Sequence, residues 1–321
     1  MLAALVVLLS GCGGEDAATG GGEAVTLVAY TTPREVYEVV IPAFQKTPEG
    51  EGVSFEQSYG ASGEQSRAVE AGLPASIVAF SLEPDVTRLV EAGLVEDGWA
   101  TGAHKGMVSE SVVVLAVRKG NPEGIRGWDD LVREGVEVIT PNPFTSGGAR
   151  WNVMAAYGAK RQEGASHEEA VAYLGELFEH VSVQNKSARE ALQTFVGGKG
   201  DVLISYENEA ITAQQKGEEL DYVIPDATIL IENPIAATKE APASAQRFID
   251  YLRSDEAQKV FAEKGYRSID EALVDESRYP KPTQLFEITE FGGWEKVMQD
   301  FFDREDGVMA DIQRGVGAPV E

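Results

Sequence analysis

The sequence PNPFTSGGARW, residues 141–151, lies between an apolar run at 136–140 and a helix-like run that begins at Trp151. The first N–H groups of a helix have no partner inside the helix, and the helix dipole places partial positive charge there. Glycines at Gly147 and Gly148 leave this backbone bare, so a negatively charged oxygen can approach it closely. The stretch therefore predicts a strand, a turn and an anion-binding helix start. The alternative is an ordinary glycine-rich turn that Ser146 caps.

Similar alternation of strand-like and helix-like runs continues on both sides of this stretch. Such alternation is typical of an α/β fold with a largely parallel sheet. The expected strands cover residues 25–29, 53–56, 76–80, 111–117, 136–140, 202–205 and 222–225.

Four junctions between an expected strand and an expected helix consist of small, polar or glycine residues. They lie at 30–32, 60–63, 146–148 and 186–188. In open α/β sheets ligands bind at the carboxyl ends of strands, where such junctions lie. Two junctions fall early in the chain and two in the middle. We therefore expect two lobes, each of which contributes two helix starts to one cleft.

The composition limits the class of ligand. The chain has 321 residues, enough for two lobes, and its formal net charge is -26. A mean hydropathy of -0.18 fits a globular protein. Long-range attraction to nucleic acid or to an anionic membrane is disfavoured at this charge. An anionic ligand must therefore be held by local dipoles.

The N-terminus resembles a bacterial lipoprotein signal. An apolar run at 2–9 is too short to span a bilayer and leads into Leu9-Ser10-Gly11-Cys12. This resemblance predicts a signal at 1–12, lipid attachment at Cys12 and a glycine-rich tether at 13–23. The alternatives are a plain secretory signal or an incidental apolar start. No Lys or Arg precedes the run, which favours a natural start further upstream. Cys12 is the only cysteine, so an intramolecular disulfide is excluded.

Nearly everything after the tether resembles the sulfate-binding proteins of bacterial ABC importers. The matching segments are PREVY at 33–37, GASG at 60–63, VRKGNP at 117–122, WDDLV at 128–132, the run from Val136 to Trp151, GDVLI at 200–204, ENEA at 207–210 and FGGW at 291–294. The resemblance implies the two-lobed type II periplasmic-binding fold, with each lobe a mainly parallel sheet flanked by helices. We expect residues 24–108 and 209–321 to form lobe 1, and residues 109–208 to form lobe 2.

The resemblance also implies how the ligand is held. In the family, neutral donors enclose a dehydrated sulfate; most are backbone N–H groups at helix starts, together with one serine hydroxyl and one tryptophan indole. The matching positions here are Thr31, Ser62, Ser146 with its hydroxyl, Gly147, Gly148, Ala188 and, in place of the tryptophan, Tyr206. A site of donors alone is expected to reject phosphate, which keeps a proton at pH 7. A carboxylate of Glu207 turned inward would change that expectation.

Tyr206 leaves the choice of anion open, because a phenol donates from its tip and an indole from its side. Molybdate-binding relatives resemble this arrangement, so thiosulfate, molybdate and tungstate stay alternatives to sulfate. Arg150 and Arg189 follow the proposed donors. We expect them to support the helix starts from behind, the alternative being surface salt bridges.

No cofactor, metal site or catalytic residue is expected. The histidines, His104, His167 and His180, lack metal-ligand spacing, and no nucleophile motif is present. The prediction is a monomeric, extracytoplasmic, membrane-anchored receptor that delivers sulfate to an ABC permease. An enzyme acting on sulfated or phosphorylated compounds and a sensory or scaffolding lipoprotein are the alternatives from other classes.

Overall fold

The computed structural model describes residues 23–320. The expected signal, Cys12 and all of the tether except residue 23 lie outside the described residues. Inside them, no helix is both long and apolar enough to cross a bilayer.

Helices and strands alternate along the chain, as the sequence predicts. The strands are β1 (Ala24–Tyr30), β2 (Ser54–Gly60), β3 (Ile77–Ala79), β4 (Met107–Arg118), β5 (Val138–Pro141), β6 (Val181–Asn185), β7 (Val202–Tyr206), β8 (Leu220–Val223), β9 (Ala227–Ala237) and β10 (Gln284–Phe286). The α-helices are α1 (Arg34–Phe44), α2 (Ser62–Glu70), α3 (Glu83–Glu91), α4 (Gly147–Gln162), α5 (His167–Glu179), α6 (Ala188–Val196), α7 (Glu207–Gln215), α8 (Ala243–Leu252), α9 (Asp255–Glu263), α10 (Gly293–Phe302) and α11 (Val308–Gly315). Short 3-10 helices cover 97–100, 128–132, 271–273 and 288–291.

The strands form one sheet in the order β2-β1-β3-β9-β4-β7-β5-β6. Strands β1, β2 and β3 are parallel to one another at one end, and β5, β6 and β7 are parallel at the other. Between these two groups, β9 runs antiparallel to both β3 and β4, and β4 runs antiparallel to β7. Two parallel groups are thus joined through an antiparallel centre, and the predicted α/β class is confirmed.

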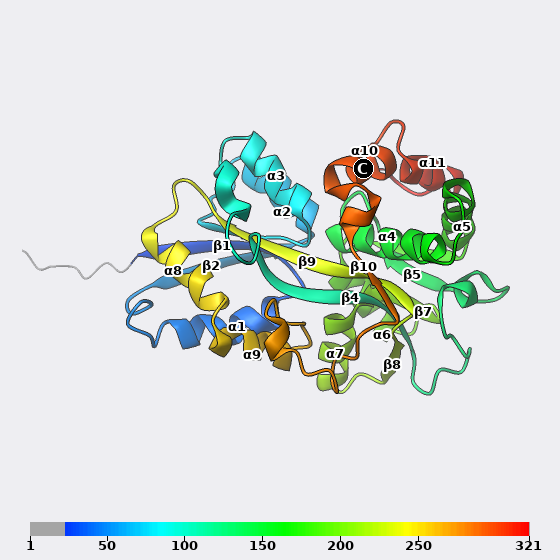
Figure 1. Cartoon of the computed structure of the whole chain (residues 1–321), viewed down its shortest axis with the longest axis horizontal. Coiled ribbons are helices and arrows are strands. Elements are labelled where there is room, and N and C mark those ends of the chain that lie inside the picture. Colours follow the sequence, from blue (N-terminus) through cyan, green and yellow to red (C-terminus); the bar gives the residue numbers. More distant parts are fainter. Residues whose placement is uncertain (1–22, 321) are drawn as a thin grey trace, which may run out of the picture.

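The long strands β4 and β9 connect the two groups. Figure 1 shows them side by side along the long axis of the molecule, and their residues pair from Met107 with Pro234 to Val112 with Leu230. Helices cover both faces at each end of the sheet (Figure 1). The two parallel groups of strands therefore flank the middle of the molecule, where β4 and β9 run from one group to the other.

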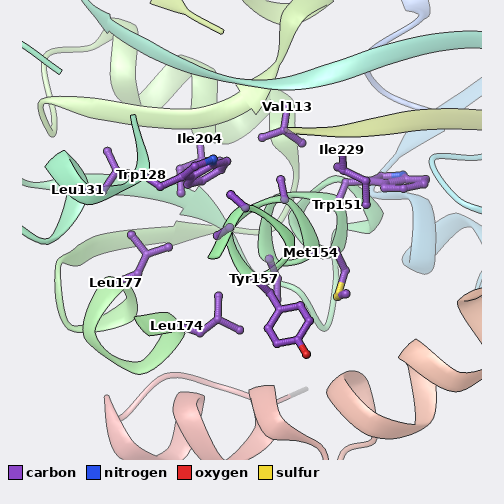
Figure 2. Close-up of a cluster of buried hydrophobic side chains, with 14 of the residues drawn as sticks. Val113, Trp128, Leu131, Trp151, Met154, Tyr157, Leu174, Leu177, Ile204 and Ile229 are labelled. Carbon is purple, nitrogen blue, oxygen red and sulfur yellow. The ribbon is translucent and has the colours of Figure 1, made fainter. Parts of the chain in front are cut away.

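Separate clusters of buried side chains fill the two ends of the molecule. One cluster, drawn in Figure 2, surrounds α4 and includes Trp128, Trp151 and Ile204. Another packs α1, α8 and α9 against β1 and includes Phe44 and Phe248. These clusters hold the two groups of strands rigid on either side of the centre.

The C-terminal helices α10 and α11 pack against the elements around α4 and α5. The ring of Trp294 in α10 lies 4.6 Å from that of Trp151 in α4, edge to face. Helix α11 contacts α5, and β8 pairs with β4 at residues 115–118. The boundaries of the lobes stay a prediction. The apolar face of α10 belongs to the hydrophobic core around α4, although the two helices lie far apart along the chain.

Candidate anion-binding site

Six segments that precede or begin helices meet around one small cavity at the centre of the molecule. The lining residues are Tyr30, Thr31, Thr32, Gly60, Ala61, Ser62, Ser81, Ser146, Gly147, Gly148, Ser187, Ala188 and Tyr206. The structure thus brings together all seven residues that the sequence predicts as ligand contacts. The volume of the cavity is only about 10 Å³. A ligand held there would therefore touch several walls at once.

The lining is neutral but rich in N–H groups. None of the lining residues is charged, and within the described residues the N–H groups of Ser62, Gly147, Gly148 and Ala188 have no hydrogen-bond partner in the chain. These groups belong to the first turns of α2, α4 and α6, where the helix dipole adds partial positive charge. The arrangement is suited to an anion.

The start of α4 supplies three of the predicted contacts. Ser146 has an extended backbone and caps the helix, because its hydroxyl oxygen accepts a bond from the N–H of Ala149 at 3.3 Å. The hydroxyl proton of Ser146 is not used in that bond. Capping and donation to a ligand are therefore compatible at this residue.

Ser62 can offer a ligand its backbone N–H but not its hydroxyl, which is already bonded within the chain. The Ser62 hydroxyl donates to Asp85 Oδ2 at 2.5 Å and accepts from the Ser81 N–H at 2.9 Å. Asp85 is buried, with 1% of its surface exposed, and also accepts a bond from Ser66 at its carbonyl. The hydroxyl is thereby occupied behind the cavity, which leaves the Ser62 N–H at the start of α2 for a ligand.

Tyr206 lies at the end of β7 and is 1% exposed. Its hydroxyl lies 2.6 Å from the Ser81 hydroxyl, and either oxygen can be the donor. Burial raises the pKa of Tyr206 well above its usual value, so the phenol keeps its proton. Sequence reasoning did not find Ser81. It follows β3 without a glycine or a capping pattern, and only its approach to Tyr206 reveals a role.

Arg150 supports the turn before α4 from behind. Its Nε donates to the Pro143 carbonyl at 2.9 Å, and its guanidinium lies 5.5 Å from the centre of the Phe302 ring. The residue is 6% exposed, so it is not a surface salt bridge. It does not line the cavity, and its effect on a ligand stays a prediction.

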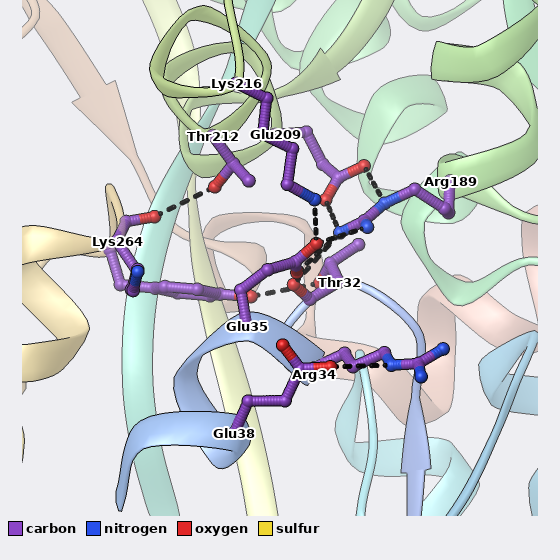
Figure 3. A network of polar contacts seen from close by, with 10 residues as sticks. Thr32, Arg34, Glu35, Glu38, Arg189, Glu209, Thr212, Lys216 and Lys264 are labelled. Carbon is purple, nitrogen blue, oxygen red and sulfur yellow. Dashed lines mark hydrogen bonds and ion pairs between the residues drawn. The ribbon is translucent and has the colours of Figure 1, made fainter.

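Arg189 forms a partly buried ion-pair cluster beside the cavity (Figure 3). Its guanidinium donates to Glu35 of α1 at 2.6 and 2.9 Å, and to Glu209 of α7 at 2.9 and 3.1 Å. Lys216 also pairs with Glu35. The cluster links α6, which provides Ala188 to the cavity, with α1 and α7. Arg189 thus connects three helices. Because only 18% of its side chain is exposed, the alternative that it forms a surface salt bridge does not fit.

The pKa values of the two carboxylates in the cluster, Glu35 and Glu209, are shifted in opposite directions. Burial raises the pKa of Glu35, but hydrogen bonds from Arg189 and Lys216 outweigh it and lower the value to about 2. A lowered folded-state pKa means that the stabilisation is complete above about pH 4.5 and is lost as the pH falls toward 2. Burial raises the pKa of Glu209, and the positive charge of Arg189 offsets only part of that increase. Removing Arg189 would leave Glu209 as an uncompensated buried charge.

Glu207 does not turn toward the cavity. It is fully buried and pairs with Arg267 through bonds of 2.8 and 3.1 Å. Within residues 23–320, no cluster of His, Cys, Asp and Glu has an arrangement that could hold a metal ion. His167 instead lies 3.0 Å from the hydroxyl of Tyr157, and His180 contacts the carbonyl of Val136.

Comparisons with known proteins place the chain in a family. Residues 25–267 match the family described as bacterial extracellular solute-binding protein. The chain therefore belongs to the bacterial extracellular solute-binding proteins. The family consists of binding proteins that work outside the cytoplasm, and the described fold agrees with that class.

Within this class the chain is a homologue of proteins named for sulfur oxyanions. The sulfate-binding protein of Synechococcus elongatus is 39% identical over 332 aligned positions, which cover 98% of this chain and 94% of the relative. The thiosulfate-binding protein of Pseudomonas aeruginosa is 34% identical, with coverage of 86% and 88%. A solved structure, the sulfate-binding protein SubI from Mycobacterium tuberculosis H37Rv, is 44% identical, has a TM-score of 0.85 and covers 88% of this chain and 100% of that one.

Proposed function

We propose that this chain is a non-catalytic receptor that binds sulfate and delivers it to an ABC importer. The observation that carries the proposal is the neutral cavity, which is lined by the starts of α2, α4 and α6, where N–H groups have no hydrogen-bond partner among the described residues. Sulfate has no proton at neutral pH, so every one of its oxygens can accept. A ring of donors satisfies such a ligand without any cation.

The proposed contacts are the backbone at Thr31, Ser62, Gly147, Gly148 and Ala188, and the hydroxyls of Ser146 and Tyr206. Peptide dipoles supply the compensating charge, because the net charge of the chain is -26 and its overall field repels an anion. Arg150 and Arg189 hold two of the helix starts in place from outside the cavity. Binding in this way needs no metal or cofactor.

Delivery requires a location next to a membrane transporter. We propose that Cys12 carries a lipid anchor and that residues 13–23 form a tether, so that the receptor stays near its permease as a monomer. Replacing Cys12 with Ser would then release the protein from the membrane fraction.

Isothermal titration calorimetry with the purified protein tests the ligand. We expect sulfate to bind with a dissociation constant at least about tenfold lower than those of thiosulfate, molybdate and tungstate, because the cavity is small. Tighter binding of molybdate would overturn the choice of sulfate while leaving an oxyanion receptor. No heat with any of these anions would overturn the receptor itself.

Thiosulfate is the second candidate. A relative at 34% identity is named as a thiosulfate-binding protein, and Tyr206 replaces the tryptophan of the sulfate-binding pattern. Equal affinities for sulfate and thiosulfate would favour a receptor that serves both.

A further inference from the structure

Within the described residues, three segments of the chain pass between the two groups of strands. Strands β4 and β9 are two of them. The third follows α9 and leads to β10, since Tyr266 belongs to the buried cluster that packs α1 against β1, whereas Phe286 belongs to the cluster around α4. Glu110 of β4 pairs with Glu232 of β9 on one side and with Arg267 of the third segment on the other. The three crossing segments thus meet in one row of residues.

The strand register brings the carboxylates of Glu110 and Glu232 close together. The N–H of Glu110 donates to the Arg267 carbonyl at 3.0 Å, and its carbonyl accepts from the Arg267 N–H at 2.8 Å. Both backbone groups of Glu110 point away from β9, so Glu110 and Glu232 form a pair without mutual backbone hydrogen bonds. In such antiparallel pairs the Cα atoms lie about 4.5 Å apart and the side chains stand on the same face. The neighbouring Asn233 points to the opposite face and donates to the Ser81 carbonyl of the cavity wall, so the carboxylate pair lies behind the cavity.

Neither of these carboxylates has a cation of its own. Within the described residues, the side chains of Glu110 and Glu232 make no hydrogen bond and no ion pair, although both are partly buried. The guanidinium of Arg267 is used elsewhere, because it donates to Glu207 and to the Pro280 carbonyl. The other charges that face the pair are mostly negative and belong to Glu83, Glu271, Glu287 and Lys105. Two ionised carboxylates in this row would therefore repel each other.

One proton held between the two carboxylates removes this repulsion, because a protonated carboxyl can donate to an ionised one. Burial and the charge of Glu232 raise the pKa of Glu110 to about 7. Burial and the charge of Glu287 also raise the pKa of Glu232. A raised folded-state pKa means that the stabilisation is complete below about pH 4.5 and is lost as the pH rises through about 7. This direction is opposite to that of Glu35.

We propose that Glu110 and Glu232 share one proton across β4 and β9, which makes the crossing between the two groups of strands a pH-sensitive hinge. In mildly acidic surroundings the shared proton holds the crossing segments together and favours the closed cavity. Above neutral pH the two charges repel, and the hinge opens more readily. Opening hydrates the pair and lets its proton leave. This inference goes beyond the proposed function, because neither residue lines the cavity.

Urea unfolding of the purified protein at pH 5.5 and pH 8.5 tests for the shared proton. We expect the midpoint of the natural protein to be lower at pH 8.5 by at least about 0.5 M. Glu110→Gln keeps a donor toward Glu232 at every pH, so its midpoint should change by less than about half as much. At pH 8.5 this variant should be more stable than the natural protein, a gain that loss of a merely structural contact does not produce.

Glu134→Gln is the matched control, since it makes the same change of charge at an exposed position before β5. Its midpoint should fall between the two pH values as much as that of the natural protein. Glu232→Gln removes the other member of the pair and should reproduce the result of Glu110→Gln. It serves as the test variant if Glu110→Gln does not fold.

Sulfate binding tests whether the pair follows the hinge. None of the residues that line the cavity is charged, and sulfate has no proton at neutral pH, so contacts in the cavity alone exchange no protons. Calorimetry at pH 7.5 in two buffers of different ionisation enthalpy measures the protons taken up on binding. We expect the natural protein to take up about 0.2 to 0.5 proton per sulfate, and Glu110→Gln less than about 0.1.

The outcomes separate this inference from the proposed function. An equal pH dependence of the midpoint in the natural protein and in both pair variants would overturn the shared proton. Sulfate binding without proton uptake would overturn the hinge and leave the sulfate receptor intact. Absence of sulfate binding would overturn the receptor, and the urea midpoints would then decide the shared proton on their own.

Discussion

Gly147 and Gly148 are neighbours in the first turn of α4, yet different parts of the molecule surround them. A Cβ atom on Gly148 would lie 3.5 Å from the ring of Tyr206, an ordinary contact on the wall of the cavity. A Cβ atom on Gly147 would lie 2.8 Å from the Cβ of Ser81, which is too close. Gly148 thus leaves room for a ligand, whereas Gly147 leaves room for the segment after β3.

The same division of tasks recurs at the start of α6. Ala188 lines the cavity, while the side chain of the next residue, Arg189, points to Glu35 of α1. At both helix starts, one residue faces the proposed ligand and its neighbour joins distant segments of the chain. Ligand contact and the approach of the two groups of strands can therefore be altered separately.

The largest effect is expected for Gly148→Asp. This change puts a carboxylate where the N–H groups converge, so sulfate affinity should fall more than about a thousandfold by calorimetry. Gly148→Ala is the matched variant. Its methyl group fits the chain but takes up ligand space, so affinity should fall by about ten- to a hundredfold with the melting temperature nearly unchanged. Full affinity in both variants would show that the cavity is not where the anion binds.

Arg189→Gln should destabilise the fold by about 3 kcal/mol, because Glu209 stays buried without its cation. Urea unfolding at pH 7 measures this free energy. Arg314→Gln is the control, since it removes an exposed pair with Asp311 and should cost less than about 1 kcal/mol. Equal losses in both variants would mean that the cluster beside the cavity is no more than a surface ion pair.

Gly147→Ala is expected to have the smallest effect on binding, about tenfold, and a distinct cause. The added methyl group pushes against Ser81 and not against the ligand, so the segment after β3 must move away from α4. Small-angle scattering should then show a larger radius of gyration with sulfate present than the natural protein has. An unchanged radius of gyration together with weaker sulfate binding would contradict the idea that Gly147 makes room for the segment after β3 and Gly148 for the ligand.

The four helix starts were predictable because their chemistry is local. Glycines, small residues and the capping serines at 146 and 187 indicate a helix start without any knowledge of the fold. The predicted strands match β1 to β5, β7 and β8 to within a few residues. Helix α1 differs, because it has no side-chain cap and Glu35 in its first turn pairs with Arg189.

Other parts of the structure depend on contacts that are distant in sequence. The central strand β9 was missed, since Glu232, Asn233 and Pro234 interrupt its apolar pattern. Asn233 is nevertheless fully buried, because it donates to the Ser81 carbonyl and accepts from the Ser109 hydroxyl. Ser81 was missed for a related reason, since its role depends on a partner 125 positions away. A local sequence pattern does not indicate which distant residues will form hydrogen bonds with a buried polar side chain.

The bond from the indole of Trp151 to the Ser81 carbonyl makes this ring a natural optical probe. Trp151 is fully buried on α4, and its polar edge is tied to the segment that follows β3. Any separation of these segments hydrates the ring and moves its fluorescence emission to longer wavelengths. The emission wavelength of Trp151 would therefore report any change in the packing of α4 against the segment after β3, without an attached dye.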